Sequence, residues 1–209
     1  MKTIGILLFL LGFKFPAFTQ HTLPVKVLWN NQAVHENDTY EFRNGHLNIA
    51  QLKFYLSAFS TNETEKPTSF FLYSLDQEEN NIVLPKHLAG NKLCFTIGID
   101  STINAGGVMG DILDPTQGMY WTWQSGFINF KFEATFDQRK IEYHLGGYAY
   151  PYNSSRHVCL NSKTKNPTLV LHLDRWFEDM QRDCPNNIMS PGELAMKASN
   201  ILSTCFELQ

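Results

Sequence analysis

The chain has 209 residues and a mass of 24.0 kDa, which is the size of a single domain. Apolar residues make up 43% of the chain and aromatic residues 13%, so it can bury a sizeable core and is not a disordered protein. The formal net charge is -3 and the sequence contains no block of basic residues, which argues against an electrostatic nucleic-acid binder.

Residues 1–19 have the pattern of a secretory signal peptide. Lys2 gives a positive start, residues 4–13 form an apolar run, and Ala17-Phe18-Thr19 offers small residues at a cleavage site. The apolar run is too short to span a bilayer as a helix. We therefore predict a periplasmic or secreted protein whose mature chain begins at residue 20, with an uncleaved N-terminal anchor as the alternative. Cleavage would remove two lysines and change the net charge from -3 to about -5.

The chain from residue 25 to residue 173 is predicted to be mainly β. It contains short segments that are apolar or alternate between apolar and polar residues, and clusters of Asn, Gly, Pro and Ser separate them. The predicted strands are 25–29, 51–59, 69–75, 92–99, 127–136, 141–145, 156–160 and 168–173. This number of short strands predicts an antiparallel β-sandwich or barrel-like domain. Residues 86–90 are predicted to form a helical turn.

Two short helices are predicted at the C-terminal end. Residues 173–183 place Trp176, Phe177 and Met180 with the spacing of a short amphipathic helix. A second helix is predicted to begin with Ser190 as the N-cap, Pro191 as the first helical residue and Glu193 completing a capping box. Its predicted buried face consists of Leu194, Ala198, Ile201, Leu202 and Cys205. Since no repeat or low-complexity linker occurs, we expect residues 20–209 to form a single domain.

The chain contains four cysteines: Cys94, Cys159, Cys184 and Cys205. An even number in an exported chain predicts up to two disulfides, and four cysteines allow three pairings. We favour Cys184–Cys205, which would join the two C-terminal helical segments, together with Cys94–Cys159. A thiolate metal cluster is the alternative, but the sequence has no CxxC pair.

The most unusual segment runs from residue 110 to residue 132. In it, Asp114-Pro115-Thr116-Gln117-Gly118 predicts a turn. Met119, Tyr120, Trp121 and Trp123 follow directly. In an extended chain Met119, Trp121 and Trp123 share one face and Tyr120 lies on the other. Two tryptophans on one face belong either to the core or to a binding surface; packing favours the core.

This segment and a later one resemble the MbnP-like copper-binding family. The resemblance rests on Asp114-Pro115-x-x-Gly118-Met119-Tyr120-Trp121-x-Trp123-Gln124-Ser125-Gly126-Phe127 and on Tyr143-His144-Leu145-Gly146-Gly147. Residues 52–57 and 188–191 agree as well, so the resemblance extends over about residues 25–206. It implies a β-rich, periplasmic or secreted protein that binds copper and takes part in copper acquisition or homeostasis.

The resemblance also implies roles for individual residues. In relatives of this family a tryptophan is oxidised to kynurenine by a MauG-type diheme peroxidase, and the kynurenine and histidines bind copper. Transferred to this sequence, His144 is the candidate ligand and Met119 a candidate thioether ligand. Trp121 and Trp123, with Tyr120 between them in sequence, are the candidates for modification or for lining the site. The peroxidase is the implied partner.

The residues themselves support a copper site in part. Imidazole binds Cu(I) and Cu(II), and thioether sulfur binds Cu(I). The seven histidines show no HxH or HxxxH spacing, so a site must be assembled from separate strands. His46, on a predicted hairpin turn, and His35 just before it are the candidates for a second imidazole. His144 lies among apolar and glycine residues, where a single histidine is often a hydrogen-bonded core residue.

The alternative function is a carbohydrate-binding or adhesion module. Trp121, Trp123 and Tyr120 would then stack on sugars, and a calcium ion would order a nearby loop. The candidate oxygen ligands for calcium are Asp100, Asn104, Asp111 and Asp114, although their spacing matches no EF-hand. An enzyme is not expected, because the sequence contains no GxSxG, HExxH or Ser/His/Asp pattern.

Overall fold

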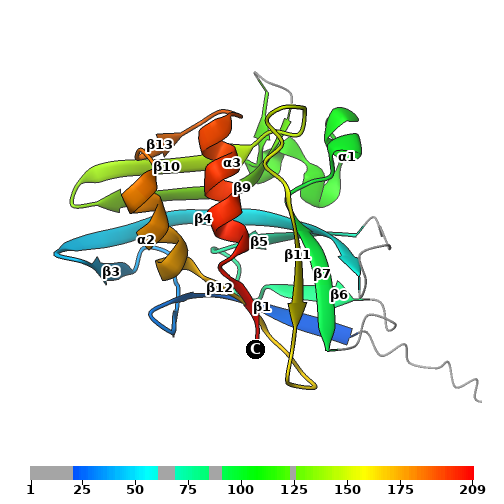
Figure 1. The fold of residues 1–209 in the computed structure, drawn as a ribbon, viewed down its shortest axis with the longest axis horizontal. Coiled ribbons are helices and arrows are strands. Elements are labelled where there is room, and N and C mark those ends of the chain that lie inside the picture. Colours follow the sequence, from blue (N-terminus) through cyan, green and yellow to red (C-terminus); the bar gives the residue numbers. More distant parts are fainter. Residues whose placement is uncertain (1–20, 61–68, 85–90, 123–125) are drawn as a thin grey trace, which may run out of the picture.

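The computed structural model describes residues 21–60, 69–84, 91–122 and 126–209, and its strands form two sheets (Figure 1). The smaller sheet has the order β14 (Phe206–Leu208), β12 (Leu169–His172), β1 (His21–Trp29), β2 (Gln32–Ala33), and β6 (Asn81–Leu84) also pairs with β1. The larger sheet has the order β11 (Arg156–Asn161), β7 (Lys92–Ile97), β4 (Gly45–Ser60), β9 (Gly126–Phe136), β10 (Arg139–Gly146), β13 (Asn187–Ile188). In addition, β3 (Thr39–Phe42) and β5 (Phe70–Ser74) pair with β4, and β8 (Tyr120–Trp121) pairs with β9.

The mainly β, sandwich-like fold predicted from the sequence is confirmed. Each of the eight predicted strands overlaps an observed one. The short strands β2, β3, β6, β8, β13 and β14 were not predicted. Two pairings, β1 with β12 and β10 with β13, are parallel rather than antiparallel. The predicted signal peptide (1–19) and the predicted turn at 86–90 lie outside the described residues.

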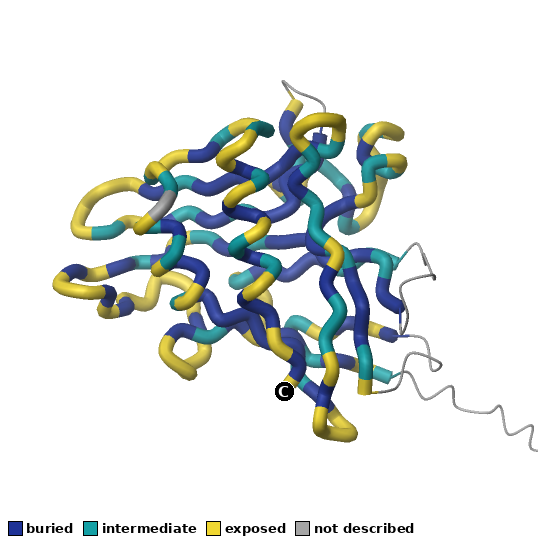
Figure 2. Tube along the Cα trace, viewed as in Figure 1, coloured by how far each residue is buried: buried dark blue, intermediate teal, exposed yellow. Residues whose placement is uncertain are grey.

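Aromatic side chains join the two sheets. Phe206 on β14 packs its ring 5.9 Å from that of Phe54 on β4 and 5.5 Å from that of Phe95 on β7, measured between ring centroids. All three side chains are buried. Figure 2 shows the same pattern along the trace, with buried residues in the strands and exposed residues at the turns. The core therefore lies between the sheets, as expected for a sandwich.

Two helices cover the larger sheet. In Figure 1, α2 (Leu173–Asp183) and α3 (Glu193–Ser203) lie across β4, β9 and β10. Trp176 on α2 is fully buried, and its ring centroid lies 4.7 Å from that of Phe130 and 5.6 Å from that of Tyr143. Its indole N–H donates to the carbonyl oxygen of Ala198 on α3 at 3.4 Å. This one side chain links both helices to β9 and β10.

The start of α3 differs from the prediction. The helix begins at Glu193 with Gly192 in the N-cap position, and no side chain caps it, so the Ser190 capping box is wrong. The buried face also shifts by one residue: Ala195 is fully buried, whereas Leu194 is 43% exposed. The small Ala195 and Ala198 side chains allow the helix to lie close to the sheet.

The opposite face of the larger sheet carries a second, smaller core. The segment that follows β7 forms three short helical turns: α1 (Ser101–Ala105), η2 (Asp111–Leu113) and η3 (Pro115–Gln117). Tyr55 of β4 donates its hydroxyl to the carbonyl oxygen of Ile112 at 2.7 Å. The second core contains Tyr55, Leu72, Ile99, Leu113, Met119, Trp121, Phe127 and Ile128. The unusual segment found in the sequence is thus the cover of this face.

One of the two favoured disulfides is formed. Cys94 on β7 and Cys159 on β11 are directly opposite in the register and are joined by a disulfide. Cys184 and Cys205, both within the described ranges, are not joined to each other by a disulfide, so that predicted pairing is wrong. The sulfur of Cys205 instead donates to the carbonyl oxygen of Ile201 in the last turn of α3 at 3.3 Å.

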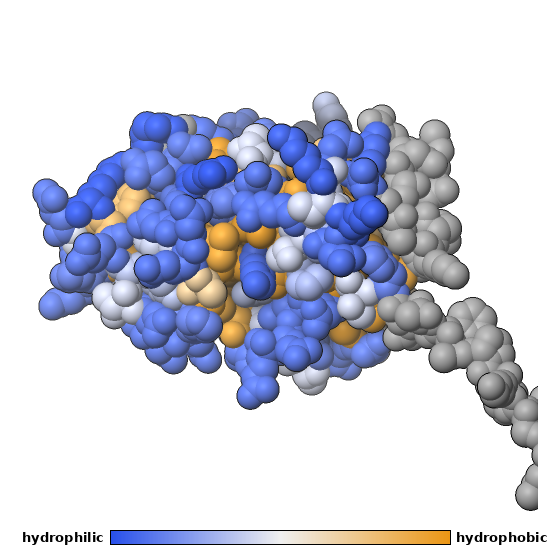
Figure 3. All heavy atoms as spheres, turned by 90° about the horizontal axis from the view of Figure 1, so that it is seen from below, coloured by the Kyte–Doolittle hydropathy of each residue, from blue (hydrophilic) through white to orange (hydrophobic). Residues whose placement is uncertain are grey.

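None of the helices in the described parts of the chain is long and apolar enough to cross a membrane. Figure 3 shows one face of the molecule, on which hydrophilic residues predominate and apolar residues form only small areas between them.

Candidate metal-binding site

His144 lies in a polar row that crosses three strands of the larger sheet. His144 on β10 is opposite Lys131 on β9, and Lys131 is opposite Lys53 on β4. One pleat further along, Glu142 is opposite Glu133. Because side chains alternate between the faces of a sheet, these residues share one face while their neighbours pack in the main core. We call His144, Lys131, Lys53, Glu133 and Glu142 the polar strip.

The imidazole of His144 is held by a carboxylate. Its Nε2 lies 2.8 Å from Oε1 of Glu133, and the Nζ of Lys131 lies 3.4 Å from the same oxygen. His144 is 7% exposed and Glu133 half-buried. An ionised carboxylate only accepts hydrogen bonds, so Nε2 is the protonated nitrogen of the neutral ring and Nδ1 keeps its lone pair. This is the carboxylate–histidine arrangement that orients metal-binding imidazoles.

The pKa values of this pair are both lowered. Burial lowers the pKa of His144 below 6.5, and this effect outweighs the opposing effect of the hydrogen bond that the imidazole donates to Glu133. Burial acts to raise the pKa of Glu133, but the hydrogen bond with His144 and the charge of Lys131 outweigh it and hold the pKa below 4.5. At neutral pH the pair is therefore an uncharged imidazole and a carboxylate. A neutral imidazole is the form that binds metal ions.

The predicted turn lies over the polar strip. Lys53 donates from Nζ to the carbonyl oxygen of Gln117 at 3.5 Å, and Lys131 donates to that of Gly118 at 3.4 Å. Gly118 has a φ of 72°, a left-handed conformation that glycine adopts without strain. The turn is thereby fixed above the lysines, and the chain that follows it is directed into the second core.

Met119 and Trp121 are buried at this point. Met119 is fully buried and Trp121 is 6% exposed. A Cβ atom added to Gly146 would lie 2.5 Å from Cζ3 of Trp121, so the indole packs directly on Gly146. Gly146 and His144 are two residues apart on β10, which places their Cα atoms about 7 Å apart on the same face. The segment of residues 114–127 and the segment of residues 143–147, which carry the family resemblance, are thus in contact through Trp121 and Gly146.

A small pocket opens beside Trp121. Its volume is about 210 Å³, and its lining includes Trp121, Tyr148, Tyr150, Tyr152 and Pro191. Gly147 forms its floor with a φ of 114°, and a Cβ at this position would lie 2.3 Å from the carbonyl oxygen of Tyr152. Gly146 and Gly147 are therefore both at positions where a larger side chain would clash with its neighbours. The pocket gives solvent access to the edge of an otherwise buried indole.

The two predicted second ligands lie elsewhere. His46 is exposed at the hairpin between β3 and β4, seven residues before Lys53 along β4. At about 3.3 Å per residue this places it about 23 Å along the strand from the row that contains His144. The backbone N–H of His35 donates to the hydroxyl of Tyr40 on β3 at 2.8 Å, so His35 lies at the same distant end. The structure therefore does not bring His46 or His35 to His144.

The proposed sugar platform and calcium loop are not formed as predicted. Trp121 is buried and Tyr120 is half-buried against Phe127, while Trp123 lies outside the described residues. The oxygens of the calcium candidates have structural partners: those of Asp100 and Asp114 accept backbone N–H groups of Thr102 and Thr116, and that of Asn104 accepts the N–H of Phe127. In the described ranges the three aspartates Asp100, Asp111 and Asp114 do not form a group that could hold a metal ion.

Comparisons with known proteins give the family and the fold. The family model of MbnP matches residues 19–191. The chain belongs to the MbnP family. Among solved structures, MbnP from Methylosinus trichosporium is similar with a TM-score of 0.54 and 11% sequence identity, over 84% of this chain and 82% of that chain. At this identity the similarity shows a common fold. The search of curated proteins returned no match.

Two features of this MbnP-family chain were missed from the sequence. Glu133 was not identified as the partner of His144, and His157 was not identified as a neighbour of Cys159. A signal for the first was present. Asp137 and Gln138 have φ values of 46° and 70°, which form a two-residue hairpin loop, and such a loop fixes which residues of the two strands are opposite. Predicting that loop would have paired residue 131 with 144.

The lowered pKa values predict how stability depends on pH. Between the folded pKa of His144 and its unfolded value of 6.5, the unfolded state binds more protons, so stability falls as pH falls. Glu133 acts in the same direction below its unfolded value of 4.5. We expect the His144→Gln variant to lose less unfolding free energy than wild type between about pH 7.5 and about pH 5, measured by denaturant unfolding. An unchanged profile for His144→Gln would contradict the assignment.

Proposed function

We propose that this MbnP-family protein is exported and binds copper as part of its acquisition or homeostasis, with Nδ1 of His144 as the nitrogen ligand. The observation that carries the proposal is the packing of the Trp121 indole on Gly146, two residues from the carboxylate-held His144 on β10. The role is binding and not catalysis. In this proposal residues 1–19 are the cleaved signal peptide.

The chemistry of the polar strip fits a copper ion of low charge. The two lysines and two glutamates of the strip balance, and His144 is neutral at pH 7 because burial lowers its pKa. A site without excess negative charge offers little attraction to hard divalent ions, which prefer oxygen ligands. Imidazole and thioether are ligands for Cu(I), and Met119 is the nearby thioether of the second core.

A modified tryptophan would supply a further ligand. Kynurenine carries an aromatic amine and a ketone, which tryptophan lacks, and both are donor groups for copper. Trp121 lies against Gly146 and borders the aromatic pocket, so an oxidised ring here would lie at the residue two positions from His144 on β10. Trp123 is the second candidate. The oxidant in this proposal is a MauG-type diheme peroxidase acting as a partner.

Copper titration of variants tests the ligand assignment. Replacing an outer-shell partner of a metal ligand costs about 10–100-fold in affinity, so loss of a ligand itself should cost at least as much. We expect His144→Gln to weaken copper binding by at least about tenfold and Glu133→Gln by about tenfold or more. The matched control is His46→Gln, an exposed histidine on the same sheet, which should bind as wild type. Wild-type affinity in His144→Gln would overturn the assignment.

Peptide mass spectrometry tests the modification. Protein purified from its native host should show a gain of one or two oxygen atoms, or the replacement of a carbon by an oxygen, on the peptide of residues 118–131. Fragmentation then distinguishes Trp121 from Trp123. An unmodified peptide in protein from that host would reject the kynurenine ligand but leave the His144 assignment to the titration.

A further inference from the structure

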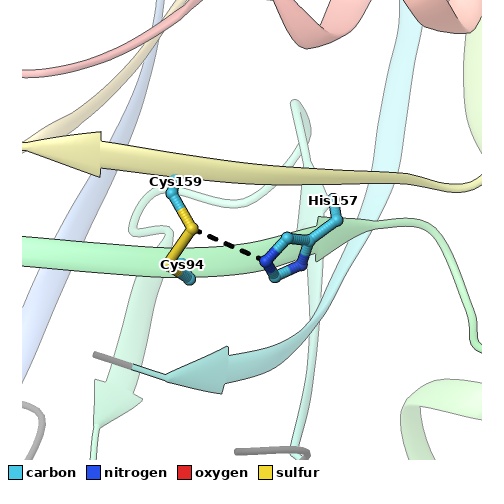
Figure 4. Close-up of side chains that lie close together, drawn as sticks. All are labelled: Cys94, His157 and Cys159. Atoms are coloured by element: carbon cyan, nitrogen blue, oxygen red, sulfur yellow. Dashed lines mark hydrogen bonds between the residues drawn. A yellow bond between two sulfur atoms is a disulfide. The ribbon is translucent and has the colours of Figure 1, made fainter. Parts of the chain in front are cut away.

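A disulfide and an imidazole lie together at the edge of the larger sheet, as Figure 4 shows. Cys94 and Cys159 are opposite each other on β7 and β11 and are bonded. His157 lies two residues before Cys159 on β11, so it projects from the same face, and its Nε2 is 3.5 Å from Sγ of Cys159. The three potential ligand atoms all lie within 4.8 Å of one another. In the described part of the chain this is the one such group of three His, Cys, Asp or Glu side chains.

This group is separate from the polar strip. The strand order β11-β7-β4-β9-β10 places β11 four strands from the strand of His144. At about 4.8 Å per strand this is about 19 Å across the sheet. The three side chains of this group differ in exposure: His157 is exposed, Cys159 half-buried and Cys94 fully buried. A reagent from solution therefore reaches the Cys159 sulfur first.

We propose that Cys94, Cys159 and His157 form a reduction-dependent site for monovalent copper. The disulfide keeps the site closed, because the thiolate and not the disulfide sulfur is the strong metal ligand. Reduction opens it and leaves two sulfurs beside an imidazole that is already in place. This site does not depend on the copper site proposed at His144.

The opening step is a thiol–disulfide exchange with an external dithiol. A thiolate of the dithiol attacks Sγ of Cys159, and the Cys159–Cys94 bond breaks with release of the Cys94 thiolate. The second thiol of the reductant then attacks the mixed disulfide and releases Cys159. Two electrons and two protons pass to the protein sulfurs, and the dithiol is oxidised to a disulfide. Binding of Cu(I) displaces the two thiol protons, so the site holds two thiolates, one imidazole and one cation.

The ligand set selects the ion. Thiolate is a soft ligand that favours Cu(I), and imidazole binds the same ion. Structural zinc sites use four protein ligands in a tetrahedron, whereas this group supplies three. Cys205 competes poorly, since burial raises the pKa of its thiol to about 11 and its sulfur donates to the carbonyl oxygen of Ile201. Three soft or borderline ligands without a fourth suit a three-coordinate Cu(I) ion.

The test compares oxidised and reduced protein under anaerobic conditions. The full chain is reduced with a water-soluble phosphine, which is converted to its oxide, and is then titrated with Cu(I) against a chromogenic Cu(I) chelator. We expect reduced wild type to bind one more copper ion per chain than oxidised wild type. Cys94→Ser/Cys159→Ser, which keeps Cys184 and Cys205, should lose that additional ion. Equal binding by the oxidised and reduced proteins, or full binding by the double variant, would overturn the proposal.

A single substitution tests whether His157 is a ligand. His157→Gln in the reduced protein should bind this copper at least about tenfold more weakly, and His46→Gln should not differ from wild type. X-ray absorption of the reduced His144→Gln variant, which lacks the ligand of the other proposed site, should show two sulfur neighbours and one nitrogen neighbour at copper. Copper with sulfur neighbours alone would exclude the imidazole. His144→Gln should retain the additional ion, which separates failure of this site from failure of the site at His144.

Discussion

Trp176→Ala is expected to lower the free energy of unfolding by about 3–5 kcal/mol, the cost typical of truncating a buried tryptophan. The side chain is fully buried and packs on Phe130, Phe132 and Tyr143. The substitution removes these contacts and leaves a cavity, and it also leaves the carbonyl oxygen of Ala198 without the indole N–H. Denaturant unfolding followed by circular dichroism measures the change.

The matched control is Leu194→Ala on the neighbouring helix. Leu194 is 43% exposed, so its truncation should change the free energy of unfolding by no more than about 0.5 kcal/mol. A loss below about 1 kcal/mol for Trp176→Ala would mean that the two helices contribute little to the core, contrary to the packing described.

The position of Trp176 also bears on the polar strip. Tyr143, which contacts Trp176, and His144 are adjacent on β10 and point to opposite faces of the sheet. Packing of Tyr143 in the main core therefore fixes the orientation of His144 toward Glu133 on the other side. Side chains alternate along β10, so the packing of one side chain in the main core orients the next one on the opposite face. Scaffolds commonly position functional groups in this way.

The larger elements could be predicted because their signals are local. Residues 127–136 alternate between apolar and polar side chains, and this alternation matches β9 and separates Phe130 and Phe132 from Lys131 and Glu133. Residues 173–183 coincide with α2. In these segments the periodicity of burial decides the structure, and the sequence contains that periodicity.

The short strands could not be predicted because the contacts that form them are not local in the sequence. β13 has two residues and β14 three, and their pairing is decided by contacts with β10 and β12 far along the chain. The same applies to the parallel pairing of β1 with β12, whose residues are more than 140 positions apart, as in Val25 opposite Leu169. The residues of a two- or three-residue segment such as β13 or β14, taken alone, do not distinguish a strand from a loop.

The candidate site was predicted in part. The two motifs that carry the family resemblance do meet, through Trp121 and Gly146. The second imidazole was sought among histidines close to turns, and these lie at the distant end of β4. Which side chain approaches His144 is decided by the register of the β9–β10 hairpin, and composition carries no information about register.

Loss of the Cys94–Cys159 disulfide is expected to lower the free energy of unfolding by about 2–5 kcal/mol. The two cysteines are 65 positions apart, and the chain-entropy estimate for a loop of this length is about 4 kcal/mol. The native pairing of β7 with β11 extends over six residue pairs, so the effect arises mainly because the cross-link restricts the unfolded chain. The comparison is Cys94→Ala/Cys159→Ala against oxidised wild type in denaturant. Wild type in reductant is the control and should match the variant, and a difference below about 1 kcal/mol between variant and oxidised wild type would contradict the expectation.

The copper site of Cys94, Cys159 and His157 requires that the chain stays folded after its disulfide is reduced. Single domains have unfolding free energies of about 5–15 kcal/mol, so a chain in that range remains folded after losing about 4 kcal/mol. Cu(I) that binds the reduced native state but not the unfolded chain would restore about 2.7 kcal/mol at a free concentration one hundred times its dissociation constant. The alanine variant keeps the same strand pairing without the sulfurs, so it should gain none of the stabilisation that this site provides. Copper bound at His144 would stabilise the variant and reduced wild type alike. Reduction and copper would then act in opposite directions on the free energy of unfolding, since reduction removes the covalent link between β7 and β11 and copper restores a link through a metal ion.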